Sequence, residues 1–494
     1  MPAERPSPAR DGRRLHPSSL LFSLLRHVKA YAVPALLVLL FSKGDRVELW
    51  LGLILIPVMV FEIYRYFSLR YRLLPEELVV TDGVFFKNER HVPLSRIQNV
   101  DLVQNPLQRL FGVADVRIET AGGSEPEAVL RVLSEKLVAE LREHIFAGRR
   151  EPNAPLRESD ADQPLVLLTS RDILLLGLDP GRGLALFFVV LGAAYEFGLF
   201  QGLRRLEEYS GLLDGLPGWA LWLLGAAAAL FGAALLLALS VSWTWLRLGG
   251  FRVERNGDDF RLQSGVLTRL AATVPGHRIQ SITVAESLMQ RWFARVSVKV
   301  ETAGGGGESE GDLAATLRRR FAPLLPTGRL PAILDALEPG LDFAGLEWNP
   351  LAPRAGRRMT RKAVLLALLL VLLLGVSLGP WWLASAFLLV PLAVIHARRE
   401  ARFSAWARPA GGLAYRSGVL TRRWRYVADA RLQVVARRES PFDRRYQMAS
   451  LCVDTAGSRA GGPRIAVPYL ERSMAEALRA ELAQGAEAAG FSWS

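Results

Sequence analysis

The stretch GVFFKNERHVPLSRIQNVDLVQNPLQRLFGVADVRIETAGG, residues 83–123, occurs three times in this chain in diverged form. A shift of 182 residues aligns its Gly-Val, Val-Pro, Arg-Ile-Gln, Gln-Arg and Glu-Thr-Ala-Gly-Gly motifs with a second copy, without a gap. A further shift of 153 residues reaches a third copy, and the hexapeptide SGVLTR stands at both 264–269 and 417–422. Matches that stay in register over about forty residues indicate three copies of one small domain.

Two kinds of polar residue recur at fixed places in the copies. An Arg-x-Gln motif supplies Arg96 and Gln98, Arg278 and Gln280, and Arg431 and Gln433, and a carboxylate follows at Glu119, Glu301 and Asp454. One interpretation is a ligand-contact face. The other is an arginine–carboxylate and glutamine–backbone network that holds loops to the sheet. We favour the network because buried polar groups must be satisfied wherever the fold repeats.

Composition points to a membrane protein with several domains. The chain has 494 residues, of which 50% are hydrophobic, and a formal net charge of +13. Its apolar residues gather in long runs flanked by arginines, which indicates membrane spans with cytoplasmic basic flanks rather than nucleic-acid binding. The single cysteine, Cys452, allows no intrachain disulfide and fits a reducing compartment.

A pair of apolar runs precedes each copy. The longest uncharged stretch, residues 363–395, would measure ~50 Å as one helix, too long for a ~30 Å hydrocarbon core. Gly379-Pro380 in its middle would break that helix. We therefore expect a tight hairpin of two short spans there, with a re-entrant hairpin as the alternative. Basic flanks place both ends of every hairpin inside.

The predicted organisation alternates membrane hairpins with sheet domains. Its segments are a disordered tail (1–19), a first hairpin (20–67), a first sheet domain (68–148), a linker (149–182), a second hairpin (183–246), a second sheet domain (247–340), a basic linker (341–362), a third hairpin (363–396) and a third sheet domain (397–494).

Each copy is predicted to be an antiparallel meander closed by one amphipathic helix, which makes the fold class α+β. Asp82-Gly83 is a tight-turn signal between two strands. Apolar residues at helical spacing predict the closing helices, around Leu137, Val138, Leu141 and Ile145, around Leu330, Ile333, Leu334 and Leu337, and around Met474, Leu478 and Leu482.

A meander-plus-helix domain that carries R-[IL]-Q and [ED]-T-A-G behind a membrane hairpin resembles the bacterial pleckstrin-homology (PH) membrane proteins of the YdbS/YdbT type. Three copies with about six spans resemble the long, YdbT-like members. The resemblance implies a PH-like fold, a bent antiparallel barrel capped by a C-terminal helix, and brings no established reaction or ligand. The third copy departs most, since Ala428 replaces Pro275, which argues against one ligand site shared by all three.

Eukaryotic PH domains of the phosphoinositide-binding kind use basic residues in the first hairpin loop. The corresponding turns here, at Gly83, Gly265 and Gly418, are tight and poor in charge, so specific phosphoinositide binding is not predicted. The basic stretch of the third copy has two equally weighted interpretations. One is contact with anionic headgroups, worth ~1 kcal/mol per charge; the other is a solvated strand face. Its residues are Arg422, Arg423, Trp424 and Arg425.

The sequence predicts no catalytic, cofactor or metal site, because its six histidines are scattered and no nucleophile elbow or P-loop stands in a strand–turn–helix context. Glu196 lies inside an expected span, where an acid is costly and often functional. The other spans offer it almost no polar partner. We therefore expect a protonated or headgroup-level acid, and expect Glu196→Gln to leave stability and phenotype unchanged.

These observations predict a non-enzymatic protein of the bacterial inner membrane, without a cofactor, that presents three cytoplasmic PH-like domains as a protein- or lipid-binding scaffold. Family analogy adds a role in envelope stress or in resistance to membrane-active compounds, and a YdbS-like single-PH membrane protein as the natural partner. The alternative is a transporter or lipid-handling protein that uses the hairpin bundle. That alternative predicts polar residues facing one another across the spans.

Overall fold

The computed structural model describes residues 67–83, 86–94, 97–120, 128–134, 164–178, 217–303, 313–456 and 465–488, with a few more positions before residue 65 and after residue 134. The chain divides into two compact units, and each is described by itself. The first contains residues 1–163, 261–273 and 309–314, and the second contains the rest. Both are built from antiparallel sheets and helices, so the fold class is α+β, as predicted.

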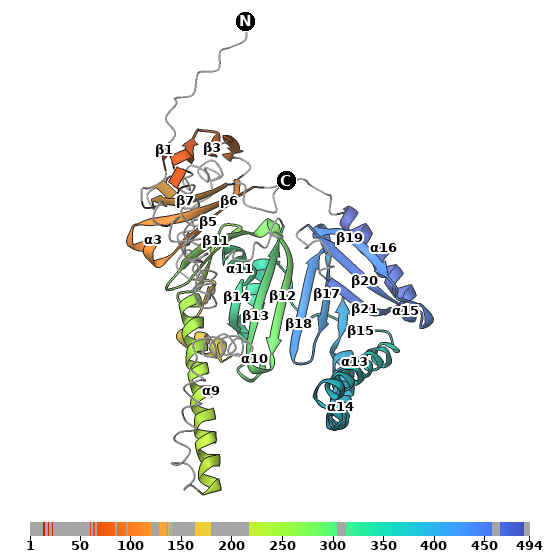
Figure 1. The fold of residues 1–494 in the computed structure, drawn as a ribbon. Coiled ribbons are helices and arrows are strands. Elements are labelled where there is room, and N and C mark those ends of the chain that lie inside the picture. Colours follow the sequence, from red (N-terminus) through yellow and green to blue (C-terminus); the bar gives the residue numbers. More distant parts are fainter. Residues whose placement is uncertain are drawn as a thin grey trace. The chain divides into compact units, whose positions relative to one another are not determined.

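The first unit holds the first repeat (Figure 1). One of its sheets has the strands β1 (Arg13–Arg14), β2 (Arg70–Leu73), β3 (Glu77–Asp82) and β4 (Asn88–Pro93). The next strands are β5 (Ile97–Gln104), β6 (Val113–Thr120) and β7 (Ala128–Ser134), with helix α3 (Pro106–Leu110) between β5 and β6. Alternate strand residues point into one core, which includes Leu78, Val80, Ile97, Val116 and Ile118.

The first unit also holds part of the second repeat. Residues 261–273 carry most of β10 (Asp259–Ser264) and β11 (Arg269–Pro275). β11 pairs antiparallel with β5, with Arg269 opposite Gln104, so the sheet that starts at β7 continues through β6 and β5 into β11. Two repeats therefore share a sheet within this unit.

The second unit begins with β8 (Val166–Leu167) and α5 (Ser170–Gly177), and the long helix α9 (Gly218–Leu248) leads into β9 (Arg252–Asn256), which pairs with β8. Further elements of the second repeat are η3 (Gly276–Arg278), β12 (Ile279–Ser287), α10 (Leu288–Trp292), β13 (Arg295–Thr302), α11 (Leu313–Arg319), β14 (Ala322–Pro326), η4 (Thr327–Arg329) and α12 (Leu330–Leu337). Ile333, Leu334 and Leu337 of α12 are buried, on the face that their spacing predicts.

The third repeat lies wholly in the second unit. Before its membrane hairpin stands β15 (Asn349–Pro350), and the hairpin is α13 (Ala355–Leu378), η5 (Pro380–Ser385) and α14 (Ala386–Phe403). The strands and helices after it are β16 (Ala405–Ala407), β17 (Gly412–Ser417), β18 (Thr421–Ala428), η6 (Asp429–Arg431), β19 (Leu432–Arg438), α15 (Pro441–Arg445), β20 (Met448–Thr455), β21 (Ile465–Glu471) and α16 (Arg472–Ala488).

Helix α16 closes the third repeat by packing on β19, β20 and β21. Ala475, Leu478 and Leu482 are buried in the core beneath it. Met474, which the spacing placed on the same face, is 45% exposed, so the predicted face is shifted by one position at its start. β18 pairs with β12, and a continuous sheet runs in the order β14-β13-β12-β18-β17-β16-β15 (Figure 1).

The first strand of each repeat comes before the predicted hairpin and not after it, which differs from the predicted hairpin followed by a complete sheet domain. β1, β8 and β15 come before the hairpins, and each pairs with the first strand after its hairpin. They lie in the segments predicted as a disordered tail (1–19) and as linkers (149–182 and 341–362). Strands of two residues are too short to show a period in the sequence.

Three segments of the described chain are long and apolar enough to cross a membrane: Trp222–Leu248, Ala355–Ser377 and Pro380–Phe403. The third hairpin turns at Gly379, whose φ is +110°, and Pro380 starts the next helical turn, as predicted. Its helices extend beyond the predicted 363–396 because α13 and α14 include their basic flanks. Most of the first hairpin and the predicted span 183–203 lie outside the described residues.

Candidate functional site

The glutamine of the Arg-x-Gln motif occupies a β-bulge in all three repeats. In the second repeat the pairing register slips between Ile279 and Ser281, so Gln280 is the extra residue. The same irregularity falls at Gln98 in β5 and at Gln433 in β19. A bulge bends a strand and increases its twist, so this motif marks the place where the fifth strand of each repeat bends.

The motif residues make hydrogen bonds to neighbouring groups of the same repeat. Gln280 Nε2 donates to the carbonyl oxygen of Arg278 at 3.3 Å, and the Ser281 hydroxyl donates to Glu301 Oε2 at 2.6 Å. In the third repeat the backbone N–H of Thr455 donates to Asp454 Oδ1 at 2.9 Å. The bond to Glu301 joins the neighbouring strands β12 and β13, whereas the other two are local to one segment of the chain.

Arg431, the last residue of η6, is half-buried, and Gln433 in β19 is exposed. Arg96 lies outside the described residues, as do the side chains of Gln98 and Glu119. A ligand-contact face built from the three copies therefore stays a prediction.

The recurring Gln-Arg motif caps a short helix, a role that the sequence analysis did not assign. Gln290 Oε1 accepts the N–H of Ser287 at 2.9 Å, and Ser287 Oγ accepts the N–H of Gln290 at 3.3 Å. In the first repeat Gln108 Oε1 accepts the N–H of Asn105 at 2.8 Å, and α15 has the same box built from serine and aspartate. The sequence pattern that could have predicted this role is a capping residue, Asn or Ser, followed three positions later by Gln or Asp.

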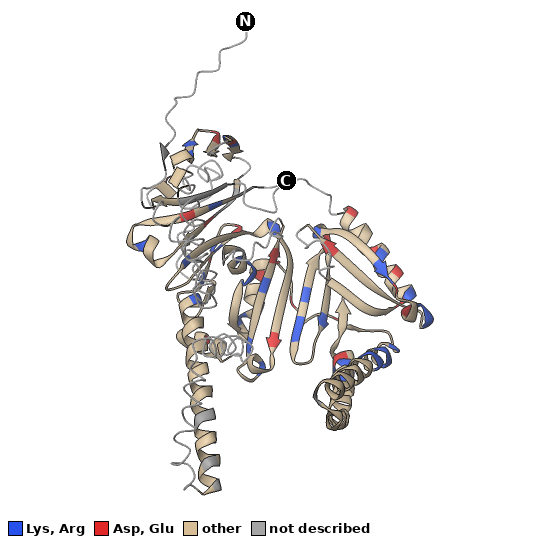
Figure 2. Ribbon diagram, viewed as in Figure 1, with Lys and Arg blue, Asp and Glu red and all other residues tan. Residues whose placement is uncertain are grey.

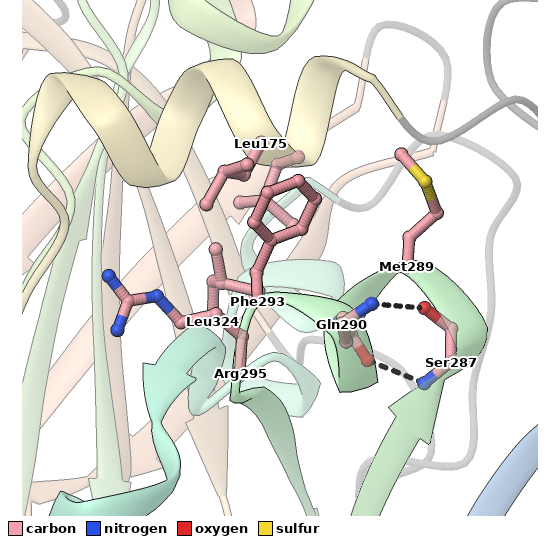
Figure 3. Close-up of a pocket in the computed structure, with 8 residues that line it drawn as sticks. Leu175, Ser287, Met289, Gln290, Phe293, Arg295 and Leu324 are labelled. Carbon is pink, nitrogen blue, oxygen red and sulfur yellow. Dashed lines mark hydrogen bonds between the residues drawn. The ribbon is translucent and has the colours of Figure 1, made fainter.

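A small pocket lies between α5 and α10 in the second unit (Figure 3). Its volume is about 30 Å³, room for about one water molecule. Arg295 at its rim pairs with Asp172 Oδ1 at 3.2 Å. The pocket is too small for a metabolite. Its lining residues are Leu175, Leu176, Ser287, Met289, Gln290, Phe293, Arg295 and Leu324.

The basic stretch of the third repeat is strand β18, whose side chains alternate between two faces of the sheet. On one face the Arg422 guanidinium lies 4.9 Å from the ring centroid of Phe403, and Trp424 meets that ring edge-on at 5.7 Å. Arg423 and Arg425 belong to the other face. Burial lowers the pKa of Arg425, and the neighbouring charge of Arg423 lowers it further.

Phe403 ends α14 and joins two parts of an arginine–aromatic cluster, defined here as Trp348, Phe403, Arg416, Arg422 and Trp424. The Arg416 guanidinium lies 4.8 Å from the ring centroid of Trp348 and 5.3 Å from that of Phe403. Because α14 can cross a membrane, the cluster stands at the end of a span, where aromatic and basic side chains meet lipid headgroups. Lipid contact by β18 stays a prediction.

Other chemistry-bearing side chains do not converge in the described part of the chain. Among those residues, no group of three or more His, Cys, Asp or Glu is placed to hold a metal ion. Cys452 is buried, and burial raises the pKa of its thiol. Glu196, the predicted intramembrane acid, lies outside the described residues.

Comparison with known proteins agrees with the repeats. The family model described as "Bacterial PH domain" matches residues 23–149, 203–323 and 362–486. The "UPF0699 transmembrane protein YdbT" of Bacillus subtilis (strain 168) is 23% identical over 477 residues, which cover 91% of this chain and 93% of that protein. No solved structure matches. With three matched regions that together cover most of its length, this membrane protein belongs to the bacterial PH domain family, as a long YdbT-like member.

Proposed function

We propose that this chain is a non-enzymatic, multi-pass protein of the bacterial inner membrane that presents its three PH-like domains at the cytoplasmic face as a scaffold. The shared sheets support this proposal, because they join neighbouring repeats into extended surfaces with many exposed strand residues. A binding surface of this kind requires no enclosed pocket.

The third hairpin supplies the observation that supports the orientation. β15 enters α13 and β16 leaves α14, and these two strands pair, with Asn349 opposite Trp406. Both ends of the hairpin therefore return to the same sheet. Basic residues are concentrated at that end of the hairpin, as Figure 2 shows for α13. They are Arg354, Arg357, Arg358, Arg361, Lys362, Arg398, Arg399 and Arg402.

The opposite end of this hairpin, Gly379–Ser385, carries no charge. Since basic loops stay in the cytoplasm during insertion, the asymmetry favours a cytoplasmic third repeat. The stretch 363–395 also lacks charged residues. A transporter that moves protons or ions through this hairpin would need such groups, so the hairpin favours the scaffold over the transporter or lipid-handling alternative.

Cysteine labelling tests the orientation. Ala477→Cys on α16 and Ala384→Cys in η5 both introduce exposed thiols, whereas the native Cys452 is buried. With a membrane-impermeant maleimide on spheroplasts, we expect Ala384→Cys to be labelled directly and Ala477→Cys only after permeabilisation. Labelling of Ala477→Cys in sealed spheroplasts would overturn the cytoplasmic presentation.

The scaffold itself is tested by native mass spectrometry of the protein in mild detergent. We expect the mass of a second polypeptide, with a single-PH membrane protein as the first candidate by family analogy. Protomers that carry only tightly held lipid would instead support the lipid-handling alternative.

A further inference from the structure

Neighbouring repeats are joined by one recurring junction, in which the fourth strand of a repeat pairs antiparallel with the fifth strand of the repeat before it. In the first unit β11 pairs with β5, with Arg269 opposite Gln104. In the second unit β18 pairs with β12, with Arg422 opposite Glu286. The repeat shifts of 182 and 153 residues carry Gln104 onto Glu286 and Arg269 onto Arg422. The two junctions therefore have the same register.

One fourth strand and one fifth strand lie at the end of a sheet and are not part of an internal junction. β4, the fourth strand of the first repeat, ends the sheet β1-β2-β3-β4, and β19, the fifth strand of the third repeat, ends the sheet β19-β20-β21. Each thus has one neighbouring strand within the described chain. By the pattern of the internal junctions, these are the two edges that the corresponding strand of another repeat would cover.

The exposure of the end strands fits this view. No residue of β12, whose outer edge is covered by β18, is fully exposed. In β19, the equivalent strand, Gln433, Val434, Arg437 and Arg438 are exposed. Asn88–His91 of β4 are exposed as well. β4 and β19 are therefore equivalent in sequence position to the junction strands, but several of their side chains are exposed.

We propose that β19 of one copy of this chain pairs with β4 of a second copy, head to tail, in the register of the internal junctions. That register places Glu439 opposite Lys87 and Arg437 opposite Glu89. Strand addition of this kind binds through main-chain hydrogen bonds, and the facing side chains provide specificity.

Charge complementarity favours a second copy of this chain as the occupant. At the internal junction Glu286 pairs with Arg291 of its own repeat at 3.3 Å and with Arg422 of the next repeat at 3.7 Å. Its equivalent, Glu439, pairs with Arg437 and with Arg472 of its own repeat, each at 3.4 Å. Lys87 of a second copy would take the place that Arg422 has inside the chain. Charges on an edge strand usually repel other strands, but facing charges of opposite sign select one partner.

Exposed apolar side chains mark the same two edges. Phe86, next to β4, is 89% exposed, and Val434 in β19 is 53% exposed. The proposed contact is heterologous, since one end of the chain meets the other end of its neighbour, and such contacts generate rings or open filaments. This inference goes beyond the proposed scaffold and does not depend on which side of the membrane the repeats face.

Disulfide cross-linking in native membranes tests the pairing. Asn88→Cys and Arg438→Cys lie opposite each other in the proposed register, and both positions are exposed. Copies with one substitution each, carrying different tags, are co-expressed and oxidised with copper phenanthroline. We expect a mixed-tag dimer, and the matched control Asn88→Cys with Gln433→Cys, about five residues out of register or ~17 Å, should give far less.

The double variant Asn88→Cys, Arg438→Cys on one chain separates the alternatives. A ladder of cross-linked oligomers supports the proposal. A cross-link confined to single chains, a cross-link to a different polypeptide, or no cross-link would overturn it.

Charge exchange provides the second test. Glu439→Lys alone and Lys87→Glu alone should each lower the oligomeric fraction in native mass spectrometry several-fold, and the two together should restore it. Restoration distinguishes the contact between copies from the loss of the local pairs of Glu439 with Arg437 and Arg472. Failure of the double variant to recover would contradict the proposed register.

Discussion

At the scale of single residues, the recurring Gly-Val of the repeat is explained by backbone conformation. Gly83, Gly265 and Gly418 have φ of +116°, +99° and +99°, in the region that L-residues rarely adopt. A Cβ at Gly418 would clash with the carbonyl oxygen of Thr421. We therefore expect Gly418→Ala to lower the free energy of unfolding by about 1–3 kcal/mol, measured by thermal unfolding in detergent. Gly328→Ala, with open space and an ordinary φ, is the matched control and should be nearly neutral.

A second prediction at this scale concerns Glu338, which accepts a hydrogen bond from the Tyr426 hydroxyl at 3.4 Å. Burial raises the pKa of Glu338 above 4.5, although the nearby charge of Arg431 opposes the shift. Because the folded state favours the protonated acid, this group's stabilisation is complete at low pH and is lost as pH rises through the folded pKa. Glu338→Gln should therefore raise the melting temperature at pH 7 and flatten its pH dependence between pH 4 and 7. An unchanged pH profile would contradict the assignment.

At the scale of elements, α5 depends on its N-terminal cap. Asp172 Oδ2 accepts the Thr169 hydroxyl at 2.7 Å and the Thr169 N–H at 3.1 Å, and the same carboxylate pairs with Arg295. Asp172→Ala removes the carboxylate half of this capping box and leaves Arg295 without this partner, so we expect the free energy of unfolding to fall by about 2–4 kcal/mol. Hydrogen exchange should show faster exchange in residues 170–177. Arg171→Ala, on the exposed face of the same helix, should leave exchange there unchanged.

At the scale of the whole molecule, the shared sheet should make the repeats of the second unit unfold together. Ala285 pairs with Ser297 of its own repeat and with Arg423 of the third repeat. Ala285→Pro removes a main-chain donor and disturbs the strand, so we expect faster hydrogen exchange in both β13 and β18. Arg438→Pro, the equivalent change in β19, should affect β20 and leave β13 protected. Confinement of the Ala285→Pro effect to the second repeat would show that the shared sheet does not couple the repeats.

Residue types and their spacing predicted the threefold repeat, the turn glycines, the break at Gly379-Pro380 and the membership in the PH family. Each of these depends on residue type and spacing within a short stretch, where local backbone chemistry and apolar length decide the outcome. In the sequence, Gln98, Gln280 and Gln433 could be recognised only as a recurring glutamine. Their bulges could not be predicted, because a bulge is defined by the pairing with the partner strand.

The way in which the repeats are joined could not be predicted from the sequence. β1, β8 and β15 have two residues each and pair across a predicted hairpin, and β18 pairs with β12 across more than a hundred residues. Strand pairing is set by main-chain hydrogen bonds that nearly every residue can make, so neither partner carries a sequence signal for the other. The shared junction, and the two strand edges it leaves at the ends of the chain, therefore became apparent once the sheets were assembled.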